Sequence, residues 1–250
     1  MDWAGLLLLN YSASENEAIV TQSNPAQASV KPLNAKNLEA RLKKTIAEQA
    51  SVRAKILSGA VRVLRKKGLN NCSVEDILLA AEISRGSFYQ YFQNKYDVAA
   101  TLLKYVQTIL IQLAQEASIG ERRPSVRMAN TFDVYVNAQT QLGWLYSMLL
   151  AEAKQIGSPL ASVREELFST MIALIDSSIT NLQGRKVEKD VFRALLYAVE
   201  DLMLFKQSQG KFSDADASHV RAVMQPIVQR TLAMQGDELL SLPLANDTEN

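Results

Sequence analysis

Cysteine and histidine are almost absent from this sequence of 250 residues, which contains one of each, Cys72 and His219. A single cysteine excludes an internal disulfide and a zinc site built on several cysteines. A single histidine argues against a histidine-based metal site or acid–base pair. Carboxylate pairs such as Glu165-Glu166 and Glu200-Asp201 are adjacent in sequence, so their side chains diverge on a helix. We therefore expect no metal, no cofactor and no enzymatic activity.

Long hydrophobic runs are also missing. No apolar segment approaches the roughly 18–20 residues that a membrane-spanning helix needs. The apolar stretch Trp3 to Leu9 is short, follows Asp2 and lacks a positively charged flank, so it does not predict a signal peptide. Hydrophobic residues make up 48% of the chain and charged residues 21%, which is ordinary for a globular protein. We expect a cytoplasmic protein that has no contact with a membrane.

The net charge of +1 conceals an uneven distribution. Residues 31–105 contain 14 Lys and Arg against 6 Asp and Glu, a balance of +8, whereas the remainder contains 13 against 20, a balance of −7. An excess of cations concentrated in one part of a chain suits contact with nucleic-acid phosphates. Charged regions are more often solvated surfaces, so the motif inside the basic part decides between the two interpretations.

Two helical segments joined by a short turn lie in this basic part. Residues 51–67 carry apolar side chains at helical spacing, and Gly68 ends the segment. Ser73, with Asp76 three residues later, marks the start of a second helix that reaches Ala81. The sequence thus predicts a helix followed by the first helix of a helix-turn-helix.

The segment Ser84 to Lys95, which reads SRGSFYQYFQNK, predicts a further helix of about nine residues after a tight turn at Glu82 and Ile83. Phe88 and Phe92 lie four residues apart on one face, where they can anchor the helix in a core. The other faces carry small, polar and cationic groups. A helix that is anchored by aromatic residues and presents hydrogen-bond donors on its free face has the properties of a helix that reads the major groove of DNA.

These segments resemble the DNA-binding domain of the TetR family of bacterial repressors. The resemblance spans residues 51–97 and rests above all on the run S-x-G-x-F-Y-x-Y-F-x-N-K at 84–95. The sequence departs from the family in two places. Glu82 stands at a turn where members often have Gly or Asn, and Cys72 and Ser73 replace the usual paired threonines. We expect a slightly different turn, and a hydroxyl that is still available for a phosphate.

The resemblance implies a set of DNA contacts. The residues that it places against base edges are Arg85, Gly86, Ser87 and Gln90. Arg85 can donate two hydrogen bonds to guanine, Gln90 can pair with adenine, and Gly86 lets the backbone approach closely. The residues that it places against phosphates are Ser73, Ser84, Tyr89, Tyr91 and Lys95, with Arg53 and Lys55 as weaker candidates. The alternative for Tyr89 is that its ring is partly buried in the core. The alternative for Lys95 is that it only begins the next helix.

The rest of the chain shows no strand-like alternation and predicts a bundle. Its helical segments cover about 96–118, 126–156, 159–182, 187–209 and 213–234. Pro226 lies inside the last segment and should kink it or leave the Ala222 carbonyl without its usual partner. The predicted fold is all-α. It consists of an N-terminal three-helix head that contains the helix-turn-helix at 51–97, a helical body at 98–235 and a flexible polar tail at 236–250.

By the same resemblance, the body binds a small molecule and pairs with a second subunit. The apolar faces of 187–209 and 213–234 suit a homodimer, although an intramolecular core explains most of them. A twofold dimer would place two reading helices on a palindromic operator in double-stranded DNA, about one helical turn or a multiple apart. The candidate ligand-lining residues, each of which could be ordinary core, are Tyr105, Phe132, Tyr135, Trp144, Tyr146, Met148, Phe168 and Met171.

An extension of about 50 residues precedes the first helix of the head and is unusual for the family. Residues 10–34 are rich in Ser, Asn, Gln, Ala and Pro and are predicted to be mobile. Residues 35–50 place Leu38, Leu42 and Ile46 on one stripe among basic residues. They form either a basic arm that contacts DNA or an amphipathic helix packed on its own subunit.

The predicted function is that of a ligand-responsive, sequence-specific DNA-binding transcription regulator. In this interpretation a dimeric repressor is released from its operator by a small molecule. The alternative is an interaction protein of the same fold, which binds another protein through its acidic half with or without DNA.

Overall fold

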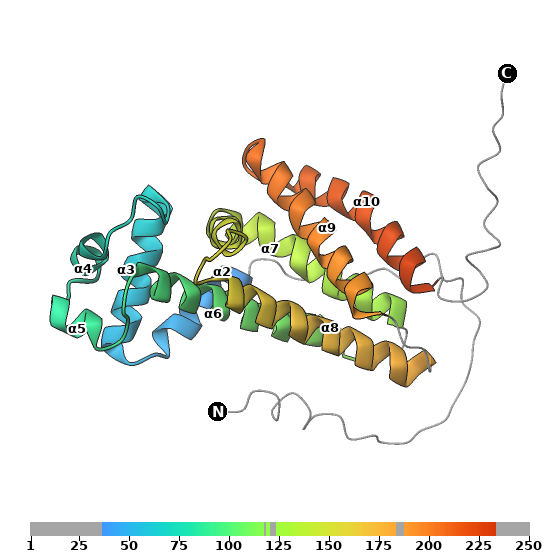
Figure 1. The fold of residues 1–250 in the computed structure, drawn as a ribbon, viewed down its shortest axis with the longest axis horizontal. Helices are drawn as coiled ribbons and strands as arrows, with labels where there is room; N and C mark the ends of the chain where they lie inside the picture. The colour runs from blue at the N-terminus through green and yellow to red at the C-terminus, as the bar shows by residue number, and fades with distance from the viewer. Residues whose placement is uncertain (1–36, 118, 121–123, 184–187, 234–250) are drawn as a thin grey trace.

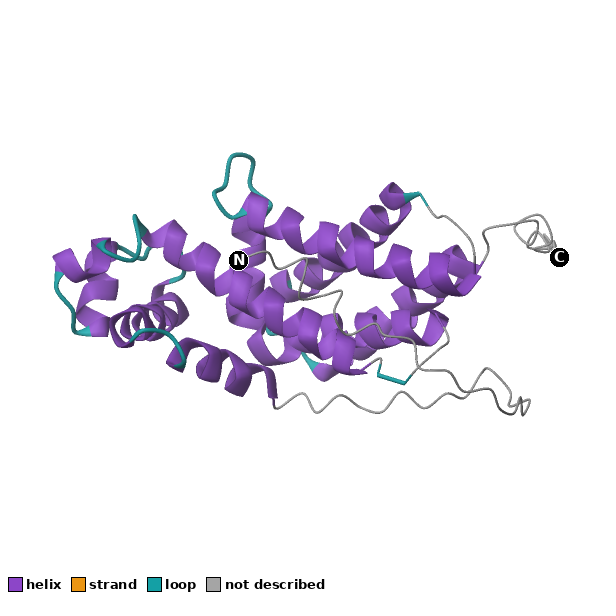
Figure 2. Ribbon diagram, turned by 90° about the horizontal axis from the view of Figure 1, so that it is seen from below, coloured by secondary structure: helices purple, strands orange, loops and turns teal. Residues whose placement is uncertain are grey.

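The computed structural model describes residues 37–117, 119–120, 124–183 and 188–233, and these ranges contain helices and no strand. The helices are α2 (Asn37–Ala47), α3 (Ser51–Lys67), α4 (Val74–Ala81), α5 (Arg85–Tyr89), α6 (Lys95–Ala117), α7 (Pro124–Ala153), α8 (Ala161–Gln183), α9 (Lys189–Ser208) and α10 (Asp214–Ala233). The predicted all-α class is confirmed (Figure 2). The predictions of a mobile segment at 10–34 and a flexible tail at 236–250 lie outside the described residues.

The molecule is elongated, with α3, α4 and α5 at one end and α7 to α10 at the other (Figure 1). We call the first group the head and the second the body. α6 begins directly after the head and runs into the body beside α8. One continuous hydrophobic core joins the two parts, because it includes Phe88 and Phe92 of the head, Leu102 and Leu103 of α6, and Leu145 of α7. The head and the body are therefore packed together through α6.

The first helix of the head, α3, has the predicted bounds. Gly68 ends it with a φ of +70°, which glycine adopts without strain, and its N–H donates to the Leu64 carbonyl. Gly59 has a different purpose. A methyl group on it would lie 2.9 Å from the backbone nitrogen of Ala81, so the absence of a side chain is what lets α3 and α4 pack this closely.

The third helix of the head is shorter than the sequence pattern predicts, since α5 covers only Arg85–Tyr89. The prediction of about nine residues was wrong, because the chain leaves the helix in a turn at Gln90 and Tyr91, and Asn94 then begins the next helix. Its side-chain oxygen accepts from the N–H groups of Tyr96 and Asp97 and so caps α6. The Phe92 N–H still donates to the Phe88 carbonyl, so the predicted i, i+4 relation of the two phenylalanines is retained.

The extension preceding the head forms a separate helix, α2, which is not continuous with α3. Leu38, Leu42 and Ile46 are all buried on its inner face. The Arg41 guanidinium makes two hydrogen bonds of 2.9 and 2.7 Å with the Glu116 carboxylate of α6, and the Leu38 N–H donates to the Gln141 side chain of α7. α2 also packs against α3, so this helix contacts the head, α6 and the body at once.

The body helices lie close to their predicted bounds. α7 is bent at Leu142, where φ and ψ are −109° and 16°, and Gly143 follows. α10 continues as one helix through Pro226. An ion pair of 2.9 Å between Arg221 and Asp133 joins α10 to α7. Within the described ranges, no helix has the length and apolar character required to cross a membrane.

Candidate nucleic-acid interface and ligand cavity

Ser73 starts α4 with a reciprocal cap. Its hydroxyl accepts from the Asp76 N–H at 3.1 Å, and its own N–H donates to the Asp76 carboxylate at 3.0 Å. Lys67 at the end of α3 lies 2.6 Å from the same carboxylate. The hydrogen bond from Lys67 and the two from Ser73 lower the pKa of Asp76 to about 2. The predicted phosphate contact, Ser73, is half-buried and already engaged in this cap.

The turn between α4 and α5 depends on an unusual backbone conformation. The backbone of Glu82 is in the left-handed helical conformation, with φ of 54° and ψ of 49°, and its N–H donates to the Leu78 and Leu79 carbonyls. The turn is therefore of the type that Gly or Asn would adopt with less strain. Ser84 follows as the cap of α5, since its hydroxyl accepts from the Ser87 N–H at 3.1 Å. This cap fixes the direction in which α5 leaves the turn.

The outer surface of α5 carries the predicted reading residues. Arg85, Gly86, Tyr89 and Gln90 are exposed, whereas Ser87 is half-buried and its hydroxyl lies 2.9 Å from that of Ser84. The Arg85 guanidinium lies 3.3 Å from the Glu75 carboxylate of α4 and 5.7 Å from the centre of the Tyr89 ring. Both groups are largely exposed, so this ion pair is weak and leaves the guanidinium able to exchange partners.

Gly86 has no structural reason to be a glycine. Its φ is not positive, and a methyl group built on it would meet only the Ser84 hydroxyl, at 3.8 Å. Glycine within a helix costs about 0.5–1 kcal/mol relative to alanine. The missing side chain therefore serves no packing within the head, unlike that of Gly59. It leaves a bare, exposed stretch of backbone next to Arg85 and Gln90, where another molecule can approach closely.

The aromatic residues of this segment divide between anchoring and exposed roles. Phe88 and Phe92 are buried, and their ring centres lie 6.0 Å apart. Tyr89 is 47% exposed, whereas Tyr91 is half-buried and packs against the core. The Arg53 guanidinium of α3 lies 5.1 Å from the centre of the Phe92 ring, which ties this predicted phosphate contact to the anchor of the reading segment.

Lys95 is the first residue of α6, which is the alternative role that the sequence allowed. Its ammonium group donates to the carbonyls of Leu69, Asn70 and Cys72, at 2.9, 3.1 and 2.9 Å. An ammonium group has three N–H donors, so all of them are used. In this arrangement Lys95 holds the turn between α3 and α4 against the start of α6. A phosphate contact by Lys95 stays a prediction, and it would require one of these hydrogen bonds to open.

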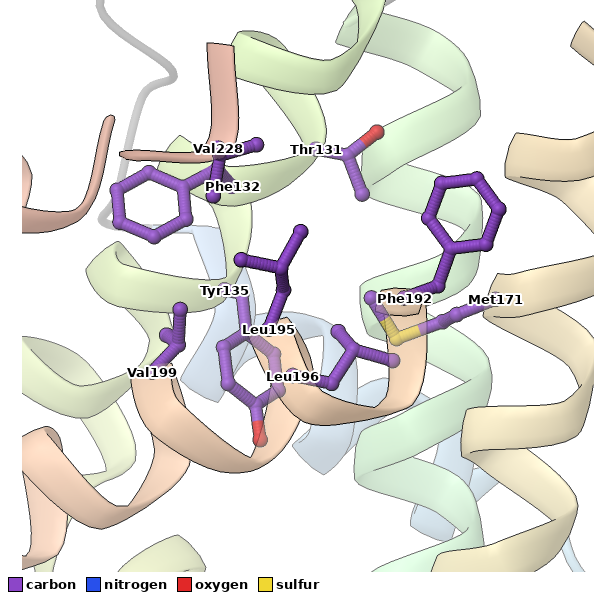
Figure 3. Close-up of a pocket in the computed structure, with 9 residues that line it drawn as sticks. All are labelled: Thr131, Phe132, Tyr135, Met171, Phe192, Leu195, Leu196, Val199 and Val228. Carbon is purple, nitrogen blue, oxygen red and sulfur yellow. The ribbon is translucent and has the colours of Figure 1, made fainter. Parts of the chain in front are cut away.

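A small apolar cavity lies in the body between α7, α8, α9 and α10 (Figure 3). Its volume is about 40 Å³, and its lining residues are Thr131, Phe132, Tyr135, Met171, Phe192, Leu195, Leu196, Val199 and Val228. Figure 3 shows that the Tyr135 hydroxyl points away from the other lining side chains. The ring of Tyr135 thus forms a wall of the cavity, while its polar end lies behind that wall.

The structure separates the eight residues that the sequence grouped as one ligand pocket. Phe132, Tyr135 and Met171 line the body cavity. Trp144 lines a second cavity, which lies between α2, α3 and α7. The four that line neither cavity are Tyr105, Tyr146, Met148 and Phe168. Of these, Tyr146 and Phe168 are fully buried core residues.

Sequence reasoning missed a buried charged pair behind the Tyr135 wall. Glu200 of α9 is fully buried and faces Arg164 of α8, whose Nε lies 2.9 Å from the carboxylate. The Tyr135 hydroxyl donates to Glu200 at 3.3 Å, and burial, above all, raises the pKa of that phenol. The Arg164 guanidinium lies 4.6 and 4.7 Å from the ring centres of Phe168 and Tyr197, which are themselves 5.4 Å apart. The sequence did contain a signal for this pair, because Glu200 shares a helix face with the buried apolar residues of α9.

Part of the chain, from α3 into α6, is similar to a known protein family. Residues 56–102 match the family described as "Bacterial regulatory proteins, tetR family". The curated protein Transcriptional regulator AcuR of Cereibacter sphaeroides is 33% identical over 85 residues, which are 34% of this chain and 36% of that protein. The alignment therefore spans about a third of the relative's length. Residues 56–102 are thus similar in sequence to the regulatory proteins of this family.

Solved structures of the same architecture extend the likeness to the body. The fatty acid degradation regulator FadR from Bacillus halodurans has a TM-score of 0.60 at 16% identity, covering 75% of this chain and 98% of that one. The regulatory protein TetR from Rhodobacter sphaeroides has a TM-score of 0.53 at 18% identity, covering 71% and 98%. At these identities the likeness concerns the fold alone.

Proposed function

We propose, from the tetR-family head at residues 56–102, that this chain is a sequence-specific DNA-binding transcription regulator that acts in the cytoplasm as a dimeric repressor. The observation that carries the proposal is the bare outer surface of α5. Gly86 exposes its backbone, and no packing within the protein requires a glycine there. The exposed side chains of Arg85 and Gln90, which can form hydrogen bonds, lie close to it. A surface of this kind suits the base edges of a major groove.

The second part of the proposal is a homodimer formed through α9 and α10. Some apolar residues of the two helices, among them Phe192, Met203 and Val220, are buried within the subunit, but Phe205, Val223 and Ile227 are 59%, 39% and 45% exposed. These residues supply the apolar surface that a four-helix contact between two copies needs. A twofold axis through this surface would relate two heads and match them to a palindromic operator.

The third part is release from the operator by a small apolar molecule that enters and enlarges the body cavity, whose volume of about 40 Å³ is below that of an ordinary small-molecule site. Met171 lines that cavity and packs in one cluster with Leu167 and Phe168 of α8 and with Ile111 of α6. A ligand that displaces Met171 would press on α6, which leads directly into the head. Release then requires the ligand to prefer the arrangement of α6 in which the two heads no longer match the operator.

Selection of bound fragments from random double-stranded DNA by the full chain tests the DNA-binding part. We expect a palindromic sequence to be enriched. Arg85→Ala should cost about 1–3 kcal/mol on that sequence and relax the preference at one position of each half-site. Lys211→Ala, an exposed lysine in the turn between α9 and α10, should leave binding unchanged.

Equal binding to selected and random fragments would reject sequence-specific regulation and favour the interaction protein. The ligand part is tested separately, by adding apolar compounds to the complex with the selected fragment. A compound that binds the chain tightly without changing its affinity for DNA would contradict release from the body cavity. The DNA-binding part would survive that result.

A further inference from the structure

The larger of the two cavities described above lies at the joint between head and body, and the proposed function leaves it without a role. It has a volume of about 320 Å³ and is bounded by α2, α3 and α7. That volume is within the lower range of small-molecule sites in proteins, which begins at about 300 Å³. It lies apart from the body cavity, since no residue lines both.

The walls of this joint cavity are apolar. α2 contributes Leu42 and Ile46, α3 contributes Val61, and α7 contributes Leu142 and the Trp144 indole. α7 is bent at Leu142, one of these lining residues. These side chains suit the flat or branched hydrocarbon part of a small molecule.

The rim of the joint cavity is cationic. Three of its lining residues are basic, Lys43, Arg62 and Arg65, and one is acidic, Glu39. The single carboxylate is shared, because it lies 3.1 Å from the Lys43 ammonium and 3.6 Å from the Arg65 guanidinium. The Arg62 guanidinium donates to the Ala80 carbonyl. The lining thus has an excess of two positive charges, so it is complementary to an anion.

Arg65 is positioned to receive that anion. Its guanidinium lies 4.8 Å from the centre of the Trp144 ring, so the indole supports the charged group at the edge of the cavity. Among the described residues its ion-pair partner is Glu39, at a distance too long for a hydrogen bond. A guanidinium presents two parallel N–H donors to a carboxylate, a geometry that Glu39 does not use here.

We propose that the joint cavity binds a small organic monoanion, a carboxylate on an aromatic or compact hydrocarbon body. The carboxylate pairs with Arg65 at the rim, and the hydrocarbon part packs between Ile46, Val61 and Leu142. Because α2 and α3 supply one side and α7 the other, the bound molecule contacts head and body together. The proposal does not depend on DNA binding or on the role of the body cavity.

Isothermal titration calorimetry of the full chain with naphthalene-2-carboxylate, and with the uncharged naphthalene-2-carboxamide, tests the proposal. We expect the carboxylate to bind about tenfold more tightly than the amide, as a charge-assisted pair predicts. Arg65→Gln should remove that preference, and Arg62→Gln should reduce it. Lys66→Gln, the exposed neighbour of Arg65 that does not line the cavity, should change nothing.

The location is tested with Leu195→Trp, which fills part of the body cavity and should leave carboxylate binding intact. Thermal unfolding of each variant verifies that it is folded. The proposal is overturned if the carboxylate does not bind at millimolar concentration or if the amide binds equally well. It is also overturned if the folded Arg65→Gln variant keeps the preference, or if Leu195→Trp abolishes binding.

Discussion

At the scale of single residues, two glycines of the head have opposite reasons to lack a side chain. Gly59 is buried, and a methyl group there would collide with the backbone of Ala81. Gly86 is exposed, and a methyl group there has room. The sequence shows the same residue type at both positions, and only the surroundings separate packing from access.

Substitution of these glycines by alanine should therefore have opposite effects. Gly86→Ala should raise the free energy of unfolding by about 0.5 kcal/mol, because alanine lowers the conformational entropy of the unfolded chain. It should weaken binding to the selected DNA fragment. Gly59→Ala should lower the free energy of unfolding by about 1–3 kcal/mol, as overpacking does. Urea unfolding and DNA titration of both variants measure these changes. A Gly86→Ala variant that binds DNA with unchanged affinity would contradict close approach at this position.

Lys95 has hydrogen-bond partners that the family resemblance did not imply. The family pattern implies a phosphate contact, and the residue has the charge for one. In the structure its three donors reach three carbonyls of the turn after α3. We propose that Lys95 acts mainly by positioning α3 and α4 relative to α6, and thereby the reading surface as a whole.

At the scale of secondary-structure elements, α4 depends on its N-terminal cap. The hydrogen bonds that Asp76 accepts from Lys67 and Ser73 hold its pKa near 2 in the folded protein, below its ordinary value of 3.8. A carboxylate with a lowered pKa stabilises the fold at pH values above the ordinary pKa. That contribution is lost as the pH falls through the folded-state pKa.

Asp76→Asn should accordingly destabilise the protein at pH 5 to 7, and its difference from the unsubstituted chain should shrink between about pH 4 and pH 2. Unfolding by urea, measured at one-unit pH intervals, tests this dependence. Asp214→Asn, at an exposed carboxylate in the first turn of α10, serves as the control. A pH-independent difference for Asp76→Asn would show that the lowered pKa does not contribute to stability.

Helix α2 is the element that most distinguishes this chain from the expected head and body. Its apolar stripe is buried, so its sequence pattern reflects packing on its own subunit. Contact between the exposed Lys43 and Lys44 and DNA stays a prediction. Leu42→Ala should lower the free energy of unfolding by about 2–5 kcal/mol, as deletion of a buried leucine side chain does.

The exposed Lys44 of the same helix provides the matched control, since Lys44→Ala should change the free energy of unfolding by less than about 0.5 kcal/mol. Urea unfolding of both variants measures the contrast. If the two substitutions cost the same, α2 does not pack on the head and body in solution as described.

At the scale of the whole molecule, the proposed dimer would place two copies of α5 on one operator and so double the number of base pairs that the protein contacts. Phe205→Glu combined with Ile227→Glu should convert dimers to monomers, because two charges would enter an apolar contact. Sedimentation equilibrium measures the change, and binding to the palindromic fragment should fall with it. Ile156→Glu, at a fully exposed isoleucine between α7 and α8, should leave the dimer intact. Dimers that persist in the doubly substituted chain would place the contact elsewhere.

Local signals in the sequence determined the helices and the anchoring residues. Ser73 with Asp76, Gly68 after α3, and the spacing of Phe88 and Phe92 act within a few residues, so their consequences can be predicted without tertiary structure. The family resemblance of the head rests on the same short range. The length of α5 was misjudged because the helical spacing of Phe88 and Phe92 continues across a turn at Gln90 and Tyr91, where the helix has already ended.

Tertiary structure alone decided which residues meet across the helices. The aromatic residues of the body have the same helical spacing whether they form a core, line the body cavity or support Arg65 at the joint, so Phe168, Phe132 and Trp144 look alike in the sequence. The partners of Lys95 and Glu200 lie 23 or more residues away in the chain. Such contacts arise from the packing of whole helices, and a local pattern cannot encode them.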